Sequence, residues 1–205
     1  KHSMFLFLDV ASPISEFHLI NDKKIIDSIK ITNNTDQKLS DLLIPTYIKI
    51  DNDYKLSKKL KKLIITIGPG SYTALRVGAS FIAGLSQSMD LPVAVISTTT
   101  IYKHLSDTNK QIGIYFESSN NQKFFLYKKN LEYINIKIEN QNFIIPELIS
   151  YIFYNLGLPK FIDTKIKSEI FSIKMHVLEN LHKMEFNKNL IIKPIYISNN
   201  NILNW

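Results

Sequence analysis

The chain has 205 residues, of which 45% are hydrophobic and 21% charged, a composition of ordinary globular proteins that excludes a disordered, fibrous or low-complexity chain. Its formal net charge of +7 comes from 24 lysines and one arginine against 18 acidic residues, spread evenly along the sequence. Because arginine clamps phosphates and reads guanine edges with a bidentate fork, this lysine-dominated charge only weakly indicates nucleic-acid binding.

The first half of the chain predicts a three-stranded antiparallel meander, followed by alternating helices and strands. Three strand-like runs are separated by the turn residues Ser12-Pro13 and Asn21-Asp22. Apolar residues then recur at helical spacing, and Pro45 within this stretch is expected to shorten or kink the helix. The predicted segments are, in order, Met4–Ala11, Ile14–Ile20, Lys24–Thr32, Asp36–Ile50, Lys62–Ile67, Ser71–Met89, Leu91–Ile96 and Ser97–Leu105.

The second half begins in the same way, with three strand-like runs joined by short links. A helix, a short strand, one or two further helices and a final strand are predicted to follow. In order, these segments are Lys110–Glu117, Lys123–Lys129, Tyr133–Ile138, Pro146–Leu156, Phe161-Ile162, Ser168–Lys183 and Leu190–Ile197. The repeated order of elements predicts an α/β protein of two related lobes, residues 1–106 and 107–205, with the second lobe abbreviated.

The glycines are concentrated in one region. Four of the six fall within 17 residues, at Gly68, Gly70, Gly78 and Gly84. The first two occupy a predicted strand-to-helix turn, where a positive φ angle or a close backbone approach is needed. The other two lie inside the predicted helix, where each costs about 1 kcal/mol relative to alanine. Two explanations remain open: close packing of this helix on its own sheet, or contact with another helix, internal or from another subunit, with Tyr72 and Arg76 as anchors.

A glycine-rich turn before a helix also suggests phosphate binding, because the free N–H groups attract anions. The turn formed by Gly68, Pro69, Gly70 and Ser71 lacks the Lys-Ser/Thr ending of a P-loop, and its proline removes one donor. Ser71 has neither the G-x-S-x-G spacing nor the adjacent base of a nucleophile, so it is predicted to cap the helix that follows.

The stretch Ile67–Gly78 reads IGPGSYTALRVG and closely resembles the signature G-P-G-S-F-T-G-L-R-I-G of the TsaB family, also called YeaZ. Weaker similarities follow the family's order along the chain. Asp9 corresponds to an opening Asp-Thr-Ser, Leu39–Pro45 resembles His-Ser-Glu-x-Leu-Leu-Pro, and Pro194-Ile195-Tyr196 resembles a closing Pro-x-Tyr. The sequence is thus identified as similar to this family over almost its whole length.

The resemblance implies an actin-like, Hsp70-like (ASKHA) fold of two related lobes, each opening with a three-stranded antiparallel meander. It also implies a non-catalytic subunit in the synthesis of N6-threonylcarbamoyladenosine in tRNA (t6A37), one that binds and supports the catalytic paralogue TsaD together with the ATPase TsaE. The chain would need no cofactor, since the complex uses ATP and threonylcarbamoyl-AMP, and it would meet tRNA only through the complex. A homodimer through the same surface is a further expectation.

The family's signature helix lies at a subunit interface, so the resemblance favours the interface explanation. The interface residues predicted on this basis are Tyr72, Ala74, Leu75, Arg76, Gly78, Ala79, Ile82, Leu39 and Leu43. The sequence also departs from the family. Glu117–Phe124 stands where members often carry Asp-Ala-Arg-Arg-x-Glu-Val-Tyr, so both arginines are missing, and Ser198 replaces a closing arginine.

Two other functions remain as alternatives: a small ATP-dependent kinase or ATPase of the same fold, and a module that binds tRNA directly. The first hairpin offers phosphates no glycine, and Asp9 is expected to be a turn or cap residue rather than a magnesium ligand. No two of the five histidines have the i, i+4 spacing of a helical zinc site, so each is expected to be exposed or partly buried. No catalytic or metal-binding residue is predicted.

The cellular setting is predicted from what the sequence lacks. The chain contains no cysteine, which excludes disulfide frameworks, thiol catalysis and cysteine-based zinc sites. No apolar run approaches the roughly 20 residues of a membrane-spanning helix. We therefore expect a cytoplasmic protein with no membrane partner.

Overall fold

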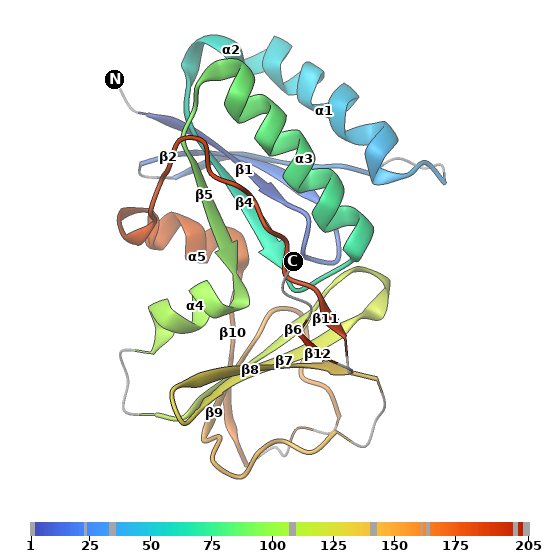
Figure 1. Cartoon of the computed structure of the whole chain (residues 1–205), viewed down its shortest axis with the longest axis vertical. Helices are drawn as coiled ribbons and strands as arrows, with labels where there is room; N and C mark the ends of the chain where they lie inside the picture. The colour runs from blue at the N-terminus through green and yellow to red at the C-terminus, as the bar shows by residue number, and fades with distance from the viewer. Residues whose placement is uncertain are drawn as a thin grey trace.

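The computed structural model describes residues 3–22, 24–32, 36–106, 110–139, 143–160, 162, 165–198 and 201–202. Two five-stranded sheets dominate these residues, and the longest helices lie on the first sheet (Figure 1). Both three-stranded meanders occur where the sequence predicts them.

The first sheet has the strand order β3-β2-β1-β4-β5. Its strands are β1 (Met4–Asp9), β2 (Glu16–Asn21), β3 (Ile25–Lys30), β4 (Leu60–Gly68) and β5 (Val93–Ser97). β1, β2 and β3 pair antiparallel, whereas β1, β4 and β5 pair parallel. Leu63, Ile64 and Ile65 of β4 are fully buried, as expected for a central strand covered on both faces.

The second sheet repeats this topology with the order β8-β7-β6-β9-β10. Its strands are β6 (Ile112–Glu117), β7 (Lys123–Lys129), β8 (Glu132–Ile138), β9 (Tyr151–Tyr154) and β10 (Lys167–Ile170). β6, β7 and β8 form the antiparallel meander, and β6, β9 and β10 pair parallel. Between β8 and β10 the described residues contain no helix. The prediction of two related lobes with an abbreviated second one is therefore confirmed.

The helix predicted over Pro146–Leu156 is wrong, because Tyr151–Tyr154 forms β9. Pairing with a strand on each side buries Ile152 completely. The run is short, apolar and aromatic, so it fits a buried strand, and it is too short for its period to distinguish a strand from a helix. Within the predicted helical stretch Ser168–Lys183, the first residues likewise belong to β10.

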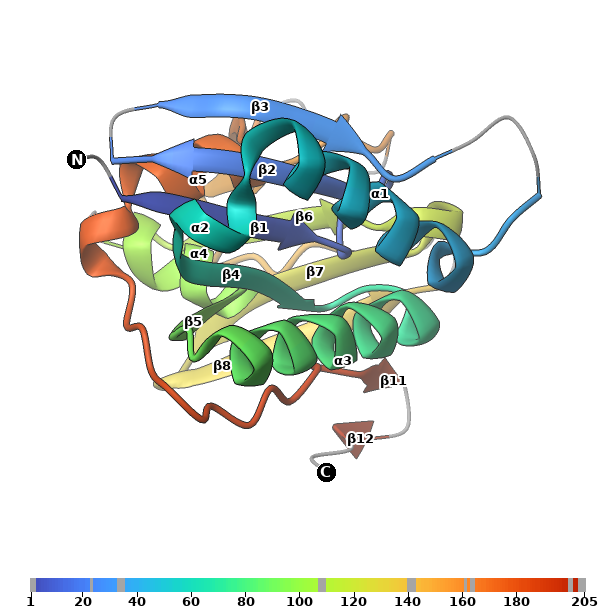
Figure 2. The ribbon, with the colours of Figure 1, turned by 90° about the horizontal axis from the view of Figure 1, so that it is seen from above.

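Helices cover both faces of the first sheet. α1 (Leu39–Tyr54) and α3 (Tyr72–Met89) lie side by side on one face, as Figure 2 shows, and α4 (Thr98–Leu105) and α5 (Ile173–Glu179) lie on the other (Figure 1). The short α2 (Leu56–Lys59) follows α1, and 3-10 turns occur at Ser119–Asn121 and Leu181–Lys183. Pro45 does not shorten α1. It lies on the exposed side of the helix, so the backbone carbonyl one turn earlier, which a proline cannot pair with, is accessible to water.

Aromatic packing fixes α1 and α3 on the sheet. Phe17 of β2, Tyr47 of α1 and Phe81 of α3 form one cluster, with ring centroids 5.4 Å apart for Tyr47 and Phe81 and 5.8 Å apart for Phe17 and Phe81. Alternation along β2 then places the next residue, His18, on the opposite face of the sheet, which is turned toward the second lobe.

The C-terminal part of the chain returns to the first sheet. Asn187 exchanges two backbone hydrogen bonds with Val93 of β5, at 2.9 and 3.0 Å. The strand predicted over Leu190–Ile197 is wrong for most of its length, since ladder pairing is confined to β11 (Ile197–Ser198) with β12 (Asn201–Ile202). Ile162 is not in a strand, and Phe161 lies outside the described residues.

A single cluster of buried side chains continues from one sheet into the other. It contains Phe7 and Leu63 of the first sheet, Phe116 and Phe124 of the second, and Val177 of α5. α4 ends at residue 105 and β6 begins at residue 112, on either side of the predicted lobe boundary, but residues 173–197 pack on the first sheet. The lobes are therefore joined by a shared core.

Candidate functional site: the signature turn and helix

The turn formed by Gly68, Pro69, Gly70 and Ser71 lies where several segments of the chain meet. Gly68 has a φ of +121°, and a Cβ atom there would lie 2.8 Å from the carbonyl oxygen of Ile195. A Cβ atom at Gly70 would lie 2.9 Å from the Ser118 hydroxyl. Both glycines are thus required by a close approach, one to the C-terminal segment and the other to the second lobe.

Ser118 links the two lobes at this turn. Its buried hydroxyl donates a hydrogen bond of 2.6 Å to the carbonyl oxygen of Ala11, in the loop after β1. Ser118 belongs to the segment Glu117–Phe124, in which the family's arginines are missing. Its position shows that this segment has a packing role here.

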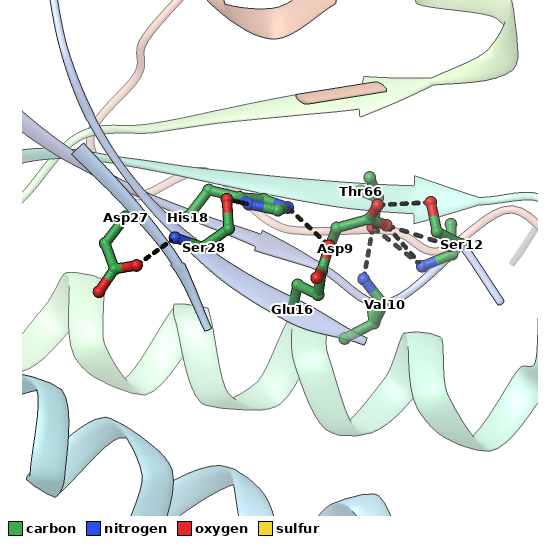
Figure 3. Close-up of polar contacts among 9 residues, drawn as sticks. Asp9, Val10, Ser12, Glu16, His18, Asp27, Ser28 and Thr66 are labelled. Atoms are coloured by element: carbon green, nitrogen blue, oxygen red, sulfur yellow. Dashed lines mark hydrogen bonds and ion pairs between the residues drawn. The ribbon is translucent and has the colours of Figure 1, made fainter. Parts of the chain in front are cut away.

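Asp9, at the end of β1, organises the first loop (Figure 3). Its Oδ1 accepts hydrogen bonds from the backbone N–H groups of Ala11 (3.0 Å) and Ser12 (3.1 Å) and from the Thr66 hydroxyl (3.2 Å), while the Ser12 hydroxyl donates to Oδ2. The expectation that Asp9 is a turn residue is confirmed. Burial raises the pKa of its carboxyl, and these hydrogen bonds partly oppose that shift.

A cleft of about 560 Å³ lies between this loop, β10 and α5. Its charged lining consists of Asp9, Glu16, Glu169, Glu179 and Lys174, so carboxylates outnumber ammonium groups. His18 also borders it, and its Nδ1 lies 2.8 Å from the Ser28 hydroxyl (Figure 3). Burial and the charge of Lys174 lower the pKa of His18 to about 4, so its ring is neutral at pH 7.

Of the four described histidines, His104 is partly buried and His182 is exposed, as expected, but His18 and His176 are buried, so the expectation is wrong for these two. His18 is 1% exposed and His176 is 6% exposed. His104 Nδ1 of α4 lies 2.9 Å from His176 Nε2 of α5, with the ring planes 15° apart. The i, i+4 rule missed this pair because the two residues are 72 positions apart and lie on different helices.

Helix α3 begins as predicted, with the Ser71 hydroxyl accepting from the Ala74 N–H at 3.5 Å. Five of the predicted interface residues are buried within the chain's own fold: Leu43, Leu75, Gly78, Ala79 and Ile82. A Cβ atom at Gly78 would lie 2.8 Å from a methyl group of Val10, so close packing on the chain's own sheet explains this glycine. Of the others, Ala74 and Leu39 are half-buried, and Tyr72 and Arg76 are exposed.

The exposed face of α1 and α3 contains apolar residues that the sequence prediction omitted. These are Ile44 and Ile48, one turn apart on α1, which are 56% and 53% exposed. They accompany Tyr72 at the start of α3, which was predicted and is 54% exposed. A groove of about 480 Å³ runs between the helices and is lined by Ser40, Leu43, Ile44, Arg76, Val77, Ser80 and Phe81. The i, i+4 spacing of Ile44 and Ile48 outside the predicted core positions is the signal that could have found this face.

Comparisons with known proteins show the family to which the chain belongs. The TsaD family model, described as tRNA N6-adenosine threonylcarbamoyltransferase, matches residues 30–191, which is more than half of the chain. The chain belongs to this family. A curated relative, the tRNA threonylcarbamoyladenosine biosynthesis protein TsaB of Bacillus subtilis (strain 168), is 32% identical over 56 residues. That match covers 27% of this chain and spans 24% of the length of the relative.

Solved structures agree with this assignment at the level of the fold. YeaZ from Pseudomonas aeruginosa superposes with a TM-score of 0.62 at 13% identity, covering 95% of this chain and 100% of that one. A Bacteroides thetaiotaomicron protein with an actin-like ATPase fold gives a TM-score of 0.51 at 9% identity, covering 86% of this chain and 96% of that one. The predicted resemblance to the TsaB family and the predicted actin-like fold are both confirmed.

No helix in the ranges that the structure describes is long and apolar enough to cross a membrane. In the same ranges, no three histidine or acidic side chains come together in a group that could hold a metal ion.

Proposed function

We propose that the chain is a non-catalytic subunit of the machinery that makes threonylcarbamoyladenosine in tRNA. Its function would be to bind and support a TsaD-type catalytic subunit, together with a TsaE-type ATPase. Membership of the TsaD family and the match to TsaB support a role in this modification. The chain would use no cofactor of its own and would meet tRNA only as part of the complex.

The observation that carries this proposal is the exposed apolar face of α1 and α3. Ile44, Ile48 and Tyr72 are each more than half exposed, and Ile44 lines an open groove beside the helix that carries the signature. Exposed large apolar side chains gathered around a groove are typical of a surface that another protein covers. The buried residues of the signature, such as Gly78, hold α3 close to the sheet and so position this face.

The geometry of the first loop supports a non-catalytic role. In a nucleotide-binding loop, free N–H and hydroxyl donors bind phosphate oxygens. Here the donors of Ala11, Ser12 and Thr66 are hydrogen-bonded to Asp9 (Figure 3). The adjoining cleft carries more carboxylates than cations, and like charges would repel a triphosphate.

Co-purification with the TsaD-type protein of the same organism tests the proposal. The full chain is expected to form a complex with it at micromolar concentration, and Ile48→Glu is expected to weaken binding at least tenfold by placing a charge in the apolar contact. Leu131→Glu, at a residue that is 85% exposed on the far lobe, is the matched control and should bind normally. The absence of a complex with the unmodified chain would overturn the proposal.

The alternative, an ATP-dependent enzyme of the same fold, is favoured by one feature, the cleft between the lobes. Calorimetric titration with magnesium and ATP distinguishes the two functions. A non-catalytic subunit should give no saturable heat at millimolar nucleotide, whereas tight 1:1 binding would support the enzyme.

A further inference from the structure

We propose that Tyr72, Arg76 and Tyr196 form a carboxylate-binding patch at the edge of the α1 and α3 face, so that the catalytic partner docks an acidic side chain on it. The C-terminal segment, residues 187–197, thereby becomes part of the interface. This inference rests on the proposed function, since it assumes that a protein partner covers this face.

The three side chains form one connected cluster. Arg76 Nη1 donates a hydrogen bond of 2.8 Å to the Tyr72 hydroxyl, one helical turn away, and its guanidinium carbon lies 5.2 Å from the centre of the Tyr72 ring. The Tyr72 ring in turn packs on Tyr196, with centroids 4.5 Å apart. Burial and Tyr72 raise the pKa of the Tyr196 hydroxyl, and the charge of Arg76 partly opposes that shift. The guanidinium is therefore held by aromatic contacts and not by an acid.

The guanidinium keeps donors available for a partner. Among the described residues, its hydrogen bonding is limited to the contact with Tyr72, and no carboxylate lies within ion-pair distance. Arg76 is the single arginine among 25 basic residues, and it is exposed. The edge formed by Nε and Nη2 can donate two parallel hydrogen bonds to a carboxylate, a bidentate geometry that lysine cannot offer.

The C-terminal segment holds Tyr196 in this place. The N–H of Ile195 donates to the carbonyl oxygen of Ile67 at 2.7 Å, immediately before the signature turn. The Ile195 carbonyl oxygen occupies the space that Gly68 leaves open. Figure 2 shows the segment running along α3 toward β11. Gly68 therefore makes room for the segment that carries Tyr196.

The position of Arg76 favours a protein partner over RNA. Arg76 lines the groove between α1 and α3, whose other lining residues include the apolar Leu43, Ile44, Val77 and Phe81. A partner helix that places an apolar side chain in this groove can bring an acidic residue one turn away to the guanidinium. A phosphate backbone has no apolar group to fill the groove.

The test measures the affinity of the full chain for the TsaD-type protein by calorimetry. Arg76→Glu should weaken binding about 100-fold, because it repels the acid, and Arg76→Lys about 10-fold, because it keeps the charge and loses the fork. Tyr196→Ala should weaken binding about 10-fold, whereas Tyr196→Phe should stay within about twofold, because it keeps the ring. Raising the salt concentration should weaken the unmodified chain more than an Arg76→Gln variant.

The matched control is Lys110→Glu, since the exposed Lys110 also lies over an aromatic ring, 4.8 Å from the centre of Tyr151, but on the second lobe. It should bind like the unmodified chain. If Arg76→Glu and Tyr196→Ala fold and bind normally, the inference is wrong while the proposed function stands. If these variants lose affinity for tRNA and not for the protein, the patch is an RNA site and the inference is wrong. If the unmodified chain does not bind, both fail.

Discussion

Gly78 and Gly84 lie on the same helix, but their surroundings differ. An added Cβ atom at Gly78 would lie 2.8 and 3.0 Å from the two methyl groups of Val10, a side chain that is 1% exposed. An added Cβ atom at Gly84 meets nothing within 4 Å. The first glycine is thus a packing requirement, and the second is an exposed helix position where glycine weakens the helix.

We predict opposite effects of alanine at these two sites. Gly84→Ala should raise the free energy of unfolding by about 0.5–1 kcal/mol, because alanine has the higher helix propensity and restricts the unfolded chain. Gly78→Ala should lower it by about 1–3 kcal/mol, because Val10 must move, and Gly78→Leu should lower it further. Urea denaturation of the two alanine variants is the measurement. A stabilised Gly78→Ala would contradict the packing described above.

The surroundings of Asp9 determine the pKa of its carboxyl group. Its carboxylate satisfies the loop donors, but it is only 4% exposed, and burial raises its pKa above the ordinary value of 3.8. Because the folded state then holds the proton more tightly than the unfolded state, Asp9 contributes most to stability below about pH 4. This contribution is lost as the pH rises through the pKa of the folded state.

We therefore predict that Asp9→Asn removes this pH dependence. The amide oxygen can keep the contacts to Ala11 and Ser12, so the variant should fold and gain stability relative to the unmodified chain as the pH rises from 4 to 7. Thermal melting across this range measures the difference, with Asp53→Asn at an exposed position controlling for the change in net charge. If Asp9→Asn instead becomes less stable relative to the unmodified chain as the pH rises, the hydrogen bonds to the carboxylate outweigh the cost of burying it.

At the scale of elements, the strands bounded by turn residues were predictable, and those defined by distant pairing were not. The meander strands, from Met4 to Lys30 and from Ile112 to Ile138, follow from strand-forming runs separated by Asn, Pro and Ser. β9 and β10 are four residues each. β9 pairs with β6, more than thirty positions earlier, and β10 pairs with β9. Local periodicity carries no information about such pairing.

The contact between α4 and α5 is another element-scale feature that no local pattern indicates. These helices follow the last strand of each sheet, and they meet through His104 and His176. Burial, then the charge of the neighbouring histidine and of Lys183, lowers the pKa of His176 to about 4. A neutral pair can share one N–H, whereas two protonated rings would repel each other.

Acid should therefore weaken this contact. A histidine whose pKa is lowered on folding contributes stability above its ordinary pKa of 6.5 and loses it as the pH falls toward 4, by up to about 1.4 kcal/mol per pH unit. His176→Phe should cost about 0.5–1.5 kcal/mol at pH 7 through the lost hydrogen bond, and its deficit should shrink toward pH 4. Urea denaturation at stepped pH measures this, with His182→Gln controlling for an exposed histidine. A deficit that stays constant would contradict it.

At the scale of the whole molecule, the three-stranded meander that opens each lobe is the main feature that the sequence predicted correctly, whereas the parallel strands β9 and β10 of the second sheet were not predicted. The repetition was visible as two meanders, although the lobes share no obvious identity. The contacts that bring distant segments together were not predictable, because Ser118, Tyr196 and the histidine pair act across distances in sequence where no motif connects them. The signature could be recognised in the sequence. Which of its residues are exposed and can face a partner depends on burial, which only the structure shows.

We propose that this chain supports a reaction that another subunit performs. The most direct test is threonylcarbamoyl transfer to tRNA in a reconstituted assay containing the TsaD-type and TsaE-type proteins, ATP and the threonylcarbamoyl donor. We expect no modified adenosine from this chain alone, and at least a tenfold increase in product when it joins the TsaD-type protein, with Ile48→Glu abolishing most of the increase. Transfer by the chain alone, or a yield that its addition leaves unchanged, would contradict the claim.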